Sequence, residues 1–245
     1  YLFSDKARVT LHQAFNRDRF ATDAGIPIGV AAIPGFPLDF RFNTSQDFGR
    51  VFDSQSHVLL NININPNWEF RNGFLYRHTD DQYFSAESLA YVPASNQVNR
   101  GLLYFQHHRR PLLNQSDVLG HFTLFGMKHT LVTGYEYQDF YNITDRAASR
   151  SVNIAPINLT NRVDTFQPFA DFPLSRVDYF TNKINAFFWQ DFIHLTSKLR
   201  LNIGGRLDGY RRIARNDPYA NGVPTSRGTE LRRNQDAYTY RAGLT

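Results

Sequence analysis

A run of four polar residues is the first place where this sequence could carry chemistry. His107, His108, Arg109 and Arg110 follow one another, and imidazole nitrogens are common metal ligands while guanidinium groups bind anions. Successive side chains of a β-strand point to opposite faces, so two adjacent histidines cannot chelate one ion as a local pair. The run therefore predicts no metal site.

A second polar cluster and the usual enzyme motifs give the same result. Thr79, Asp80 and Asp81 offer two carboxylates, but a calcium site needs about six or more oxygen ligands, so we expect a solvated loop there. The sequence has no Walker loop, Gly-x-Ser-x-Gly elbow, His-Glu-x-x-His motif or dinucleotide-binding fingerprint. Cysteine is absent, which excludes thiolate sites and thiol nucleophiles. We expect no enzyme, no catalytic residue, no metal and no cofactor.

Composition narrows the class of protein. The 27 basic residues are scattered among 22 acidic ones, and because no basic run stands out, nucleic acid is not an expected partner. The mean hydropathy is −0.45, and no run approaches the ~18 uninterrupted apolar residues that a membrane helix needs. Aromatic residues make up 15% of the chain, which favours β-strands.

One stretch shows how such strands are built. In L-L-N-I-N-I-N-P-N-W, residues 59–68, isoleucine and asparagine alternate up to Pro66. With period two, Leu60 and Ile62 share one face while Asn61 and Asn63 share the other. The return strand alternates in the same way. Residues 58–77 are therefore predicted to form a hairpin with an apolar face and a polar face.

The same plan recurs along the chain. Two further hairpins are predicted over 118–140, with a turn at 126–129, and over 181–210, with a turn at 195–198; partial strands near 7–15 and 237–245 bring the total to about eight strands by the alternation pattern. Residues 186–189 are apolar on both faces, so their facing stays open. The predicted long connections are 19–55, 79–111, 143–177 and 214–235. They exceed the ~12 to 15 residues expected of a structureless connection, so they are either functional or wrongly assigned.

Two folds would satisfy these amphipathic hairpins. A soluble β-sandwich buries the apolar faces against a second sheet. A transmembrane β-barrel turns the apolar face to lipid and joins its strands by short periplasmic turns and long extracellular loops. The alternation of short and long connections favours the barrel. The predicted fold is all-β, a partial antiparallel up-and-down transmembrane β-barrel of about eight strands.

Several segments resemble a known family. Residues 126–138, G-M-K-H-T-L-V-T-G-Y-E-Y-Q, and 188–208, F-W-Q-D-F-I-H-L-T-S-K-L-R-L-N-I-G-G-R-L-D, are similar to turn-and-strand patterns in the barrels of TonB-dependent siderophore receptors of the ferrichrome type. Weaker similarity covers nearly the whole chain. The family's barrels have about 22 strands around an amino-terminal plug, so residues 1–245 are expected to be a partial barrel domain without the plug.

The resemblance implies an outer-membrane protein that takes up a ferric siderophore with energy from the TonB complex acting through the plug. Its partners would be the ferric siderophore, TonB and outer-membrane lipid. Arg200, Arg206 and Asp208 would belong to a polar lumen wall. Siderophores of this family are bound by aromatic and polar side chains of the extracellular loops and upper lumen. By position, the candidate ligand-binding residues are Tyr83, Phe84, Tyr91, Phe140, Tyr141 and Tyr210.

Two alternatives stay open at this point. A soluble or secreted β-sandwich binding module would need no membrane, and a passive porin-like barrel would need neither a plug nor TonB. The chemical identity of the chelate does not follow from the sequence.

Overall fold

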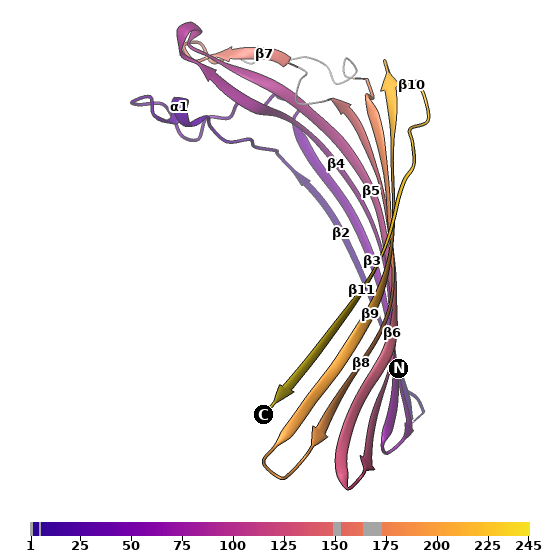
Figure 1. The fold of residues 1–245 in the computed structure, drawn as a ribbon. Helices are drawn as coiled ribbons and strands as arrows, with labels where there is room; N and C mark the ends of the chain where they lie inside the picture. The colour runs from indigo at the N-terminus through magenta and orange to yellow at the C-terminus, as the bar shows by residue number, and fades with distance from the viewer. Residues whose placement is uncertain (1, 5, 149–152, 164–172) are drawn as a thin grey trace.

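A single antiparallel sheet dominates the computed structural model (Figure 1). The structure describes residues 2–4, 6–148, 153–163 and 173–245. Within them, the sheet contains eight long strands: β2 (Ala7–Phe20), β3 (Phe48–Asn65), β4 (Trp68–Val92), β5 (Gln97–Leu124), β6 (Met127–Ala148), β8 (Arg176–His194), β9 (Arg200–Ala220) and β11 (Leu231–Leu244). Each long strand pairs with the next one along the chain. This confirms the predicted all-β, up-and-down arrangement of about eight strands.

Short elements complete the sheet and its upper end. They are β1 (Leu2–Ser4), α1 (Ile28–Ala31), the 3-10 turn η1 (Pro93–Ser95), β7 (Asn153–Asn158) and β10 (Val223–Pro224). Among the described residues, no helix is both long enough and apolar enough to cross a bilayer.

The turns at the lower end of the sheet are tight, for local chemical reasons. Phe125 and Gly126 have φ of 51° and 76°, which is the type I′ geometry that matches strand twist. The predicted position of this turn, residues 126–129, is wrong, because β6 already begins at Met127. Between β3 and β4, the backbone N–H of Asn67 donates to Asn65 Oδ1 over 2.9 Å, as in an Asx turn. The third lower turn occupies residues 195–199, close to its prediction.

The predicted long connections are shorter than expected because the strands extend into them. The expected connection over 79–111 is wrong: β4 continues to Val92 and β5 starts at Gln97. Residues 102–108 therefore belong to β5. The other three upper connections shrink to 21–47, 149–175 and 221–230, and parts of the second lie outside the described residues. Figure 1 shows the tight turns at the lower end and α1 and β7 at the upper end.

An apolar core lies at the upper end, where residues 21–47, the tip of the β4–β5 hairpin and β7 form what we call the upper lobe. Its largest cluster of buried side chains consists of Val30, Phe36, Phe42, Val98, Ile157 and Leu159. Arg100 is 1% exposed, and its guanidinium donates to the carbonyl oxygens of Phe42 over 3.0 Å and Ala155 over 2.8 Å. Because charged hydrogen bonds of this kind are strong, Arg100 fastens both segments to β5.

Candidate functional site

The register assigns every side chain of the long strands to one of two faces. The apolar face carries Leu60, Phe70 and Leu207 in its lower half, and the polar face carries Asn61 and Arg71. Many large apolar side chains of the apolar face are exposed: Leu11, Phe15, Phe52, Ile64, Tyr76, Tyr135, Phe187, Leu207, Tyr238, Tyr240 and Leu244. An exposed apolar area of this extent marks a surface that meets lipid or a partner rather than water.

Aromatic residues frame the apolar face at its lower edge. The ring of Trp68 lies over Gly120, where an added Cβ would overlap the indole. Trp68 stacks on Phe122 with centroids 6.0 Å apart, and Phe122 stacks on His129 at 4.9 Å. Such a row close to the short turns is typical of the aromatic girdle at a membrane interface.

The lower half of the polar face is held by ion pairs between strands. Arg71 Nε donates to Asp117 Oδ1 over 2.7 Å. Arg206 lies 2.8 Å from Asp208 and 3.1 Å from Glu136, which also accepts from Gln138 over 2.6 Å. The sequence predicted a polar wall containing Arg206 and Asp208. Their link to Glu136 on β6 appears only with the strand register.

Further up the polar face, aromatic rings join the charged groups. Tyr83 stacks on Phe105 with centroids 5.0 Å apart, and the Tyr83 hydroxyl donates to Glu87 over 2.7 Å. Phe105 in turn contacts the ring of His107 at 4.6 Å. Arg109 is paired with Asp81 at 2.9 Å.

A second aromatic group lies on β6, β8, β9 and β11, and we call it the aromatic–arginine platform. Phe140 and Phe180 meet edge to face with centroids 6.0 Å apart, and the Arg212 guanidinium lies 4.8 Å from the Phe180 ring. Arg233 is directly opposite Arg212 in the register. Neither arginine forms an ion pair within the described part of the chain. Because like charges placed directly opposite each other are unfavourable, the platform is suited to an anion or an electron-rich group.

The predicted ligand-binding residues divide between the two faces. Tyr83, Phe140 and Tyr210 lie on the polar face. Phe84 and Tyr141, their neighbours in sequence, point to the opposite face. Phe84 is 1% exposed and belongs to a buried cluster with Leu102 and Tyr104. Tyr91 packs against the buried cluster of the upper lobe. The structure therefore does not bring the six residues together on one surface.

The two histidines behave as the sequence predicted. His107 Nδ1 is 2.7 Å from Thr144 Oγ1, on the polar face, and His108 Nδ1 is 2.7 Å from Asp80 Oδ1, on the apolar face. Burial lowers the pKa of His107 from its usual value. The expected solvated loop at 79–81 is wrong, since these residues lie within β4. Among the described residues, no group of three or more His, Cys, Asp or Glu side chains is placed to hold a metal ion.

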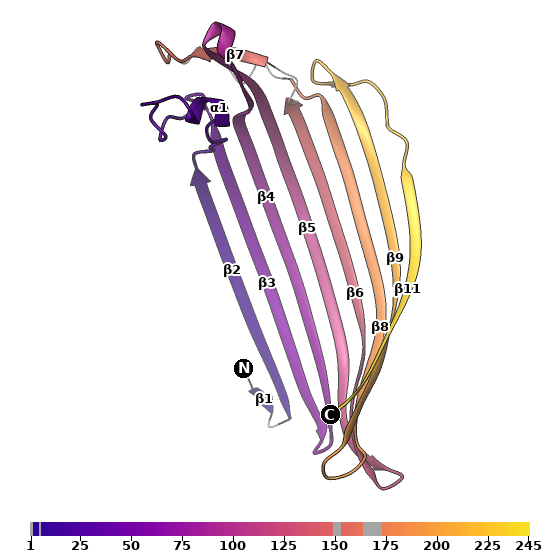
Figure 2. The same cartoon turned by 60° about the vertical axis from the view of Figure 1, so that its left-hand side comes forward.

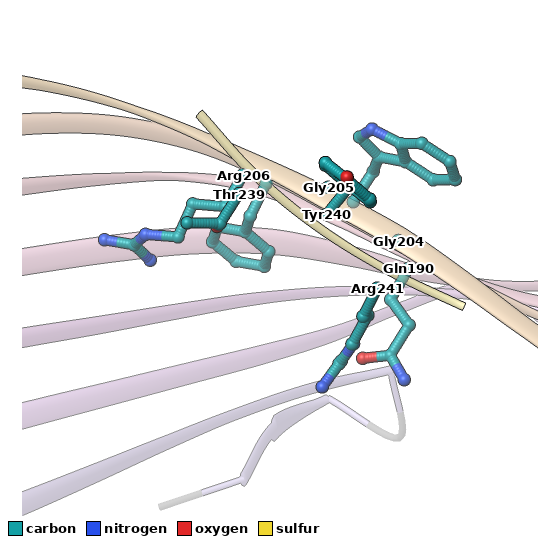
Figure 3. Close-up of a pocket in the computed structure, with 9 residues that line it drawn as sticks. Gln190, Gly204, Gly205, Arg206, Thr239, Tyr240 and Arg241 are labelled. Carbon is teal, nitrogen blue, oxygen red and sulfur yellow. The ribbon is translucent and has the colours of Figure 1, made fainter. Parts of the chain in front are cut away.

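Side-chain facing in the apolar run at 186–189 is settled by pairing with β9. Phe187 is opposite Leu207 and Trp189 is opposite Gly205, both on the apolar face, whereas Phe188 is on the polar face. A hollow of about 320 Å³ lies beside this run, lined in part by Gln190, Arg206 and Arg241, whose side chains Figure 3 shows projecting on one side of the strands. Thr239 and Tyr240 of β11 also line it.

The sheet and its two faces can now be compared with known proteins. Residues 2–245 match the family described as TonB dependent receptor-like, beta-barrel. The chain belongs to this family. The resemblance inferred from sequence is thereby confirmed at the level of the TonB-dependent receptor barrel, and the β-sandwich alternative is wrong. Proteins of this family are receptors of the bacterial outer membrane and not enzymes, so both of those expectations are confirmed.

Curated relatives cover most of this chain. The ferric-pyoverdine 358 receptor of Pseudomonas putida is 24% identical over 208 residues, which are 80% of this chain and 25% of the relative. The metal-pseudopaline receptor CntO of Pseudomonas aeruginosa (strain UCBPP-PA14) is 26% identical over 212 residues, 83% of this chain and 29% of the relative. The chain thus spans little more than a quarter of the length of these relatives.

The fold itself is similar to that of solved receptors. The open form of the ferric-catecholate import receptor Fiu from E. coli K12 superposes with a TM-score of 0.81 at 16% identity, covering 98% of this chain and 42% of Fiu. At this identity the likeness concerns the fold alone.

Proposed function

We propose that residues 1–245 form part of the barrel of an outer-membrane receptor that binds a ferric siderophore outside the cell and passes it inward with energy supplied through TonB. In this proposal the chain contributes barrel strands only, and the plug that TonB engages belongs to another part of the receptor. The transport step is non-covalent: the chelate binds, the plug moves, and the chelate is released inward.

One observation carries the proposal. The same sheet presents exposed apolar side chains on one face and interlocked charged side chains on the other, which suits a wall between lipid and a wet lumen. The chain belongs to the TonB-dependent receptor family, and the similar proteins described above are receptors for ferric pyoverdine, metal-pseudopaline and ferric catecholates. Two of these three ligands are ferric chelates, which supports an iron chelate as the cargo.

The narrower proposal is a receptor of the ferrichrome type. It is supported by the segments at 126–138 and 188–208, which resemble that branch. The complete receptor gene, expressed in a host that lacks its own siderophore receptors, tests both levels. We expect uptake of radioactive iron from at least one ferric siderophore, and loss of that uptake when tonB is deleted. Uptake that persists without TonB would favour the porin-like alternative, and uptake of a catecholate but not of ferrichrome would refute the narrower proposal.

The ligand-contact residues remain a proposal as well. Tyr83, Phe140 and Tyr210 are supported by their position on the polar face, and Phe140 also by its place in the aromatic–arginine platform. Phe84, Tyr91 and Tyr141 are less well supported because they pack in the upper lobe or point to the other face.

Phe140 and Tyr141 offer a matched test because they are adjacent on β6 and face opposite ways. Truncating a ring that contacts a ligand costs about 0.5 to 1.5 kcal/mol beyond area loss, so Phe140→Ala should weaken chelate binding to whole cells by about twofold to twelvefold. Tyr141→Ala should leave binding unchanged. Equal effects of the two substitutions would remove Phe140 from the ligand site.

A further inference from the structure

Two histidines lie directly opposite each other on neighbouring strands. His12 of β2 pairs with His57 of β3 in the antiparallel register, and Figure 2 shows these two strands side by side. Their ring centroids are 6.1 Å apart, with the ring planes inclined by 33°. His57 has the parity of Asn61 on β3, and directly opposite residues project on the same side of a sheet. Both imidazoles therefore belong to the polar face.

Cross-strand pairing gives these two rings a reach that adjacent residues of one strand lack. Directly opposite residues of an antiparallel pair have Cβ atoms about 4.5 to 5.5 Å apart. With metal–nitrogen bonds of about 2.0 to 2.1 Å, the two nitrogens of one tetrahedral site lie about 3.4 Å apart. Rotation about the side-chain bonds can bring two imidazole nitrogens on such Cβ atoms to that separation. His107 and His108 cannot do so, because they contact Thr144 and Asp80 on opposite faces.

Both rings are available for a ligand. Within the part of the chain that the structure describes, neither His12 nor His57 forms a hydrogen bond or an ion pair, whereas His129 lies 2.7 Å from Asp191. His57 Nε2 lies beside Gly73 of β4, where an added Cβ would be 4.0 Å away. A turn of this ring toward β2 therefore breaks no hydrogen bond.

The surroundings on this face do not repel a cation. The next opposite pair toward the upper lobe is Ala14 and Gln55, and neither side chain is charged. Arg77 of β4 lies opposite Gln55, but it is ion-paired with Asp53 over 2.6 Å. The next opposite pair toward the lower end is also uncharged. A metal ion between the two rings would thus meet no unpaired basic side chain on the adjacent pairs, and the small alanine leaves room for coordinated water.

We propose that His12 and His57 form a binding site for a single divalent transition-metal ion such as Zn²⁺, Ni²⁺ or Cu²⁺. Imidazole nitrogen suits these ions, and for a given set of ligands Cu²⁺ binds most tightly. The two rings supply two ligands, and water fills the remaining positions. No metal was expected from the sequence, since the two histidines lie in different predicted strands and only the register makes them opposite.

The site is separate from the candidate ligand-binding residues. His57 precedes Pro66 of the lower turn by nine residues; at ~3.3 Å per residue and a strand tilt of ~45°, it lies about 20 Å above that turn. Tyr83 is opposite Gly49, eight residues further up β3. The site has two protein ligands, fewer than the groups of three or more that are absent from the described residues. The proposal does not depend on the cargo, because the iron of a ferric chelate is already coordinated by the chelate.

The test uses the complete receptor, purified in detergent without a histidine tag and stripped of metal with a chelator. Cu²⁺ binding is measured by calorimetry, and its nitrogen ligands are counted from the electron paramagnetic resonance spectrum. The variants are His12→Gln, His57→Gln and the double variant. His194→Gln is the matched control, since His194 is a polar-face histidine whose opposite residues, Lys128 and Arg200, would repel a metal ion. The faster-migrating band of the folded receptor on an unheated gel checks that each variant is folded.

We expect the wild type and His194→Gln to bind one Cu²⁺ ion, through two nitrogens, that the double variant does not bind. Each single substitution should weaken this binding by about tenfold to a hundredfold, at least the loss caused by removing a partner of a metal ligand. The double variant should lose one ion and not two. Unchanged affinity in His12→Gln, or the loss of one ion for each histidine removed, would overturn the proposal, and so would an equal loss in His194→Gln.

Discussion

Neighbouring residues on one strand of this sheet have unrelated surroundings. Phe187 is 53% exposed on the apolar face, while Phe188 lies on the polar face so close to Gly134 that an added Cβ there would be 2.7 Å from its ring. His107 and His108 differ in the same way, one beside Thr144 and the other beside Asp80. At this scale the chemical role of a residue is set by its parity along the strand more than by its type.

Arg206 is the residue on which the lower polar face depends most. It forms ion pairs with both Glu136 and Asp208, which are 8% and 5% exposed. Replacing it by methionine leaves two largely buried carboxylates without their cation. Removing one partner of a buried pair costs about 3 to 5 kcal/mol, and because Arg206 is partly exposed we expect a loss of about 2 kcal/mol.

The measurement is the temperature at which the complete receptor loses its folded, faster-migrating band on an unheated gel. Arg200→Met is the control, because Arg200 shares the strand and face of Arg206 but forms no ion pair in the described part of the chain. We expect a lower midpoint for Arg206→Met only. If both variants unfold together with the wild type, the network is not stabilising.

At the scale of elements, the sequence predicts the lower halves of the strands well and the upper halves poorly. Around Leu60 and Leu207 one face meets lipid, so apolar and polar residues alternate. Above the bilayer both faces meet water, and the alternation disappears from β4 and β5 near Asp80 and Gln106. Backbone pairing continues where the alternation of apolar and polar residues is lost. The segment at 79–111 therefore has the composition of a loop but the geometry of a hairpin.

The candidate site is partly predictable for a related reason. Parity along one strand correctly placed Tyr210 on the face of Arg206 and Asp208. The contacts of Arg206 with Glu136, and of Arg212 with Phe180, depend on register between strands. Register is set by the turns and by the whole pairing pattern, so no local stretch of sequence contains it.

A substitution at Gly134 on β6 tests whether the close approach of β5 to this residue is needed for stability. A Cβ at Gly134 would overlap the carbonyl oxygen of Ser116 and lie 2.7 Å from Asp117 Cβ. Backbone cannot move aside as a side chain can, so Gly134→Ala should lower stability by about 1 to 3 kcal/mol. Gly73→Ala is the control, since its nearest neighbour, Leu59 Cδ2, would be at an ordinary 3.5 Å. The same gel assay measures both, and equal midpoints would show that the strands separate at little cost.

For the molecule as a whole, the central question is which face of the sheet contacts lipid and which contacts water. Residues of β3 allow the most direct test of this assignment. Leu60 and Ile62 lie on the apolar face, while Asn61 and Asn63 lie on the polar face. This part of the receptor contains no cysteine. In the complete receptor, with any cysteine outside residues 1–245 replaced by serine, single substitutions to cysteine at residues 58–63 can each carry one spin label after reconstitution into vesicles.

The expected pattern follows from the period of two. Labels at Val58, Leu60 and Ile62 should collide mainly with oxygen, which concentrates in lipid, and labels at Leu59, Asn61 and Asn63 mainly with a water-soluble nickel complex. Leu59 is the informative position, because its own side chain is apolar and only its parity assigns it to the wet face. If accessibility follows residue type instead of parity, so that Leu59 resembles Leu60, the strand does not form a wall between lipid and lumen and the proposed barrel orientation is wrong.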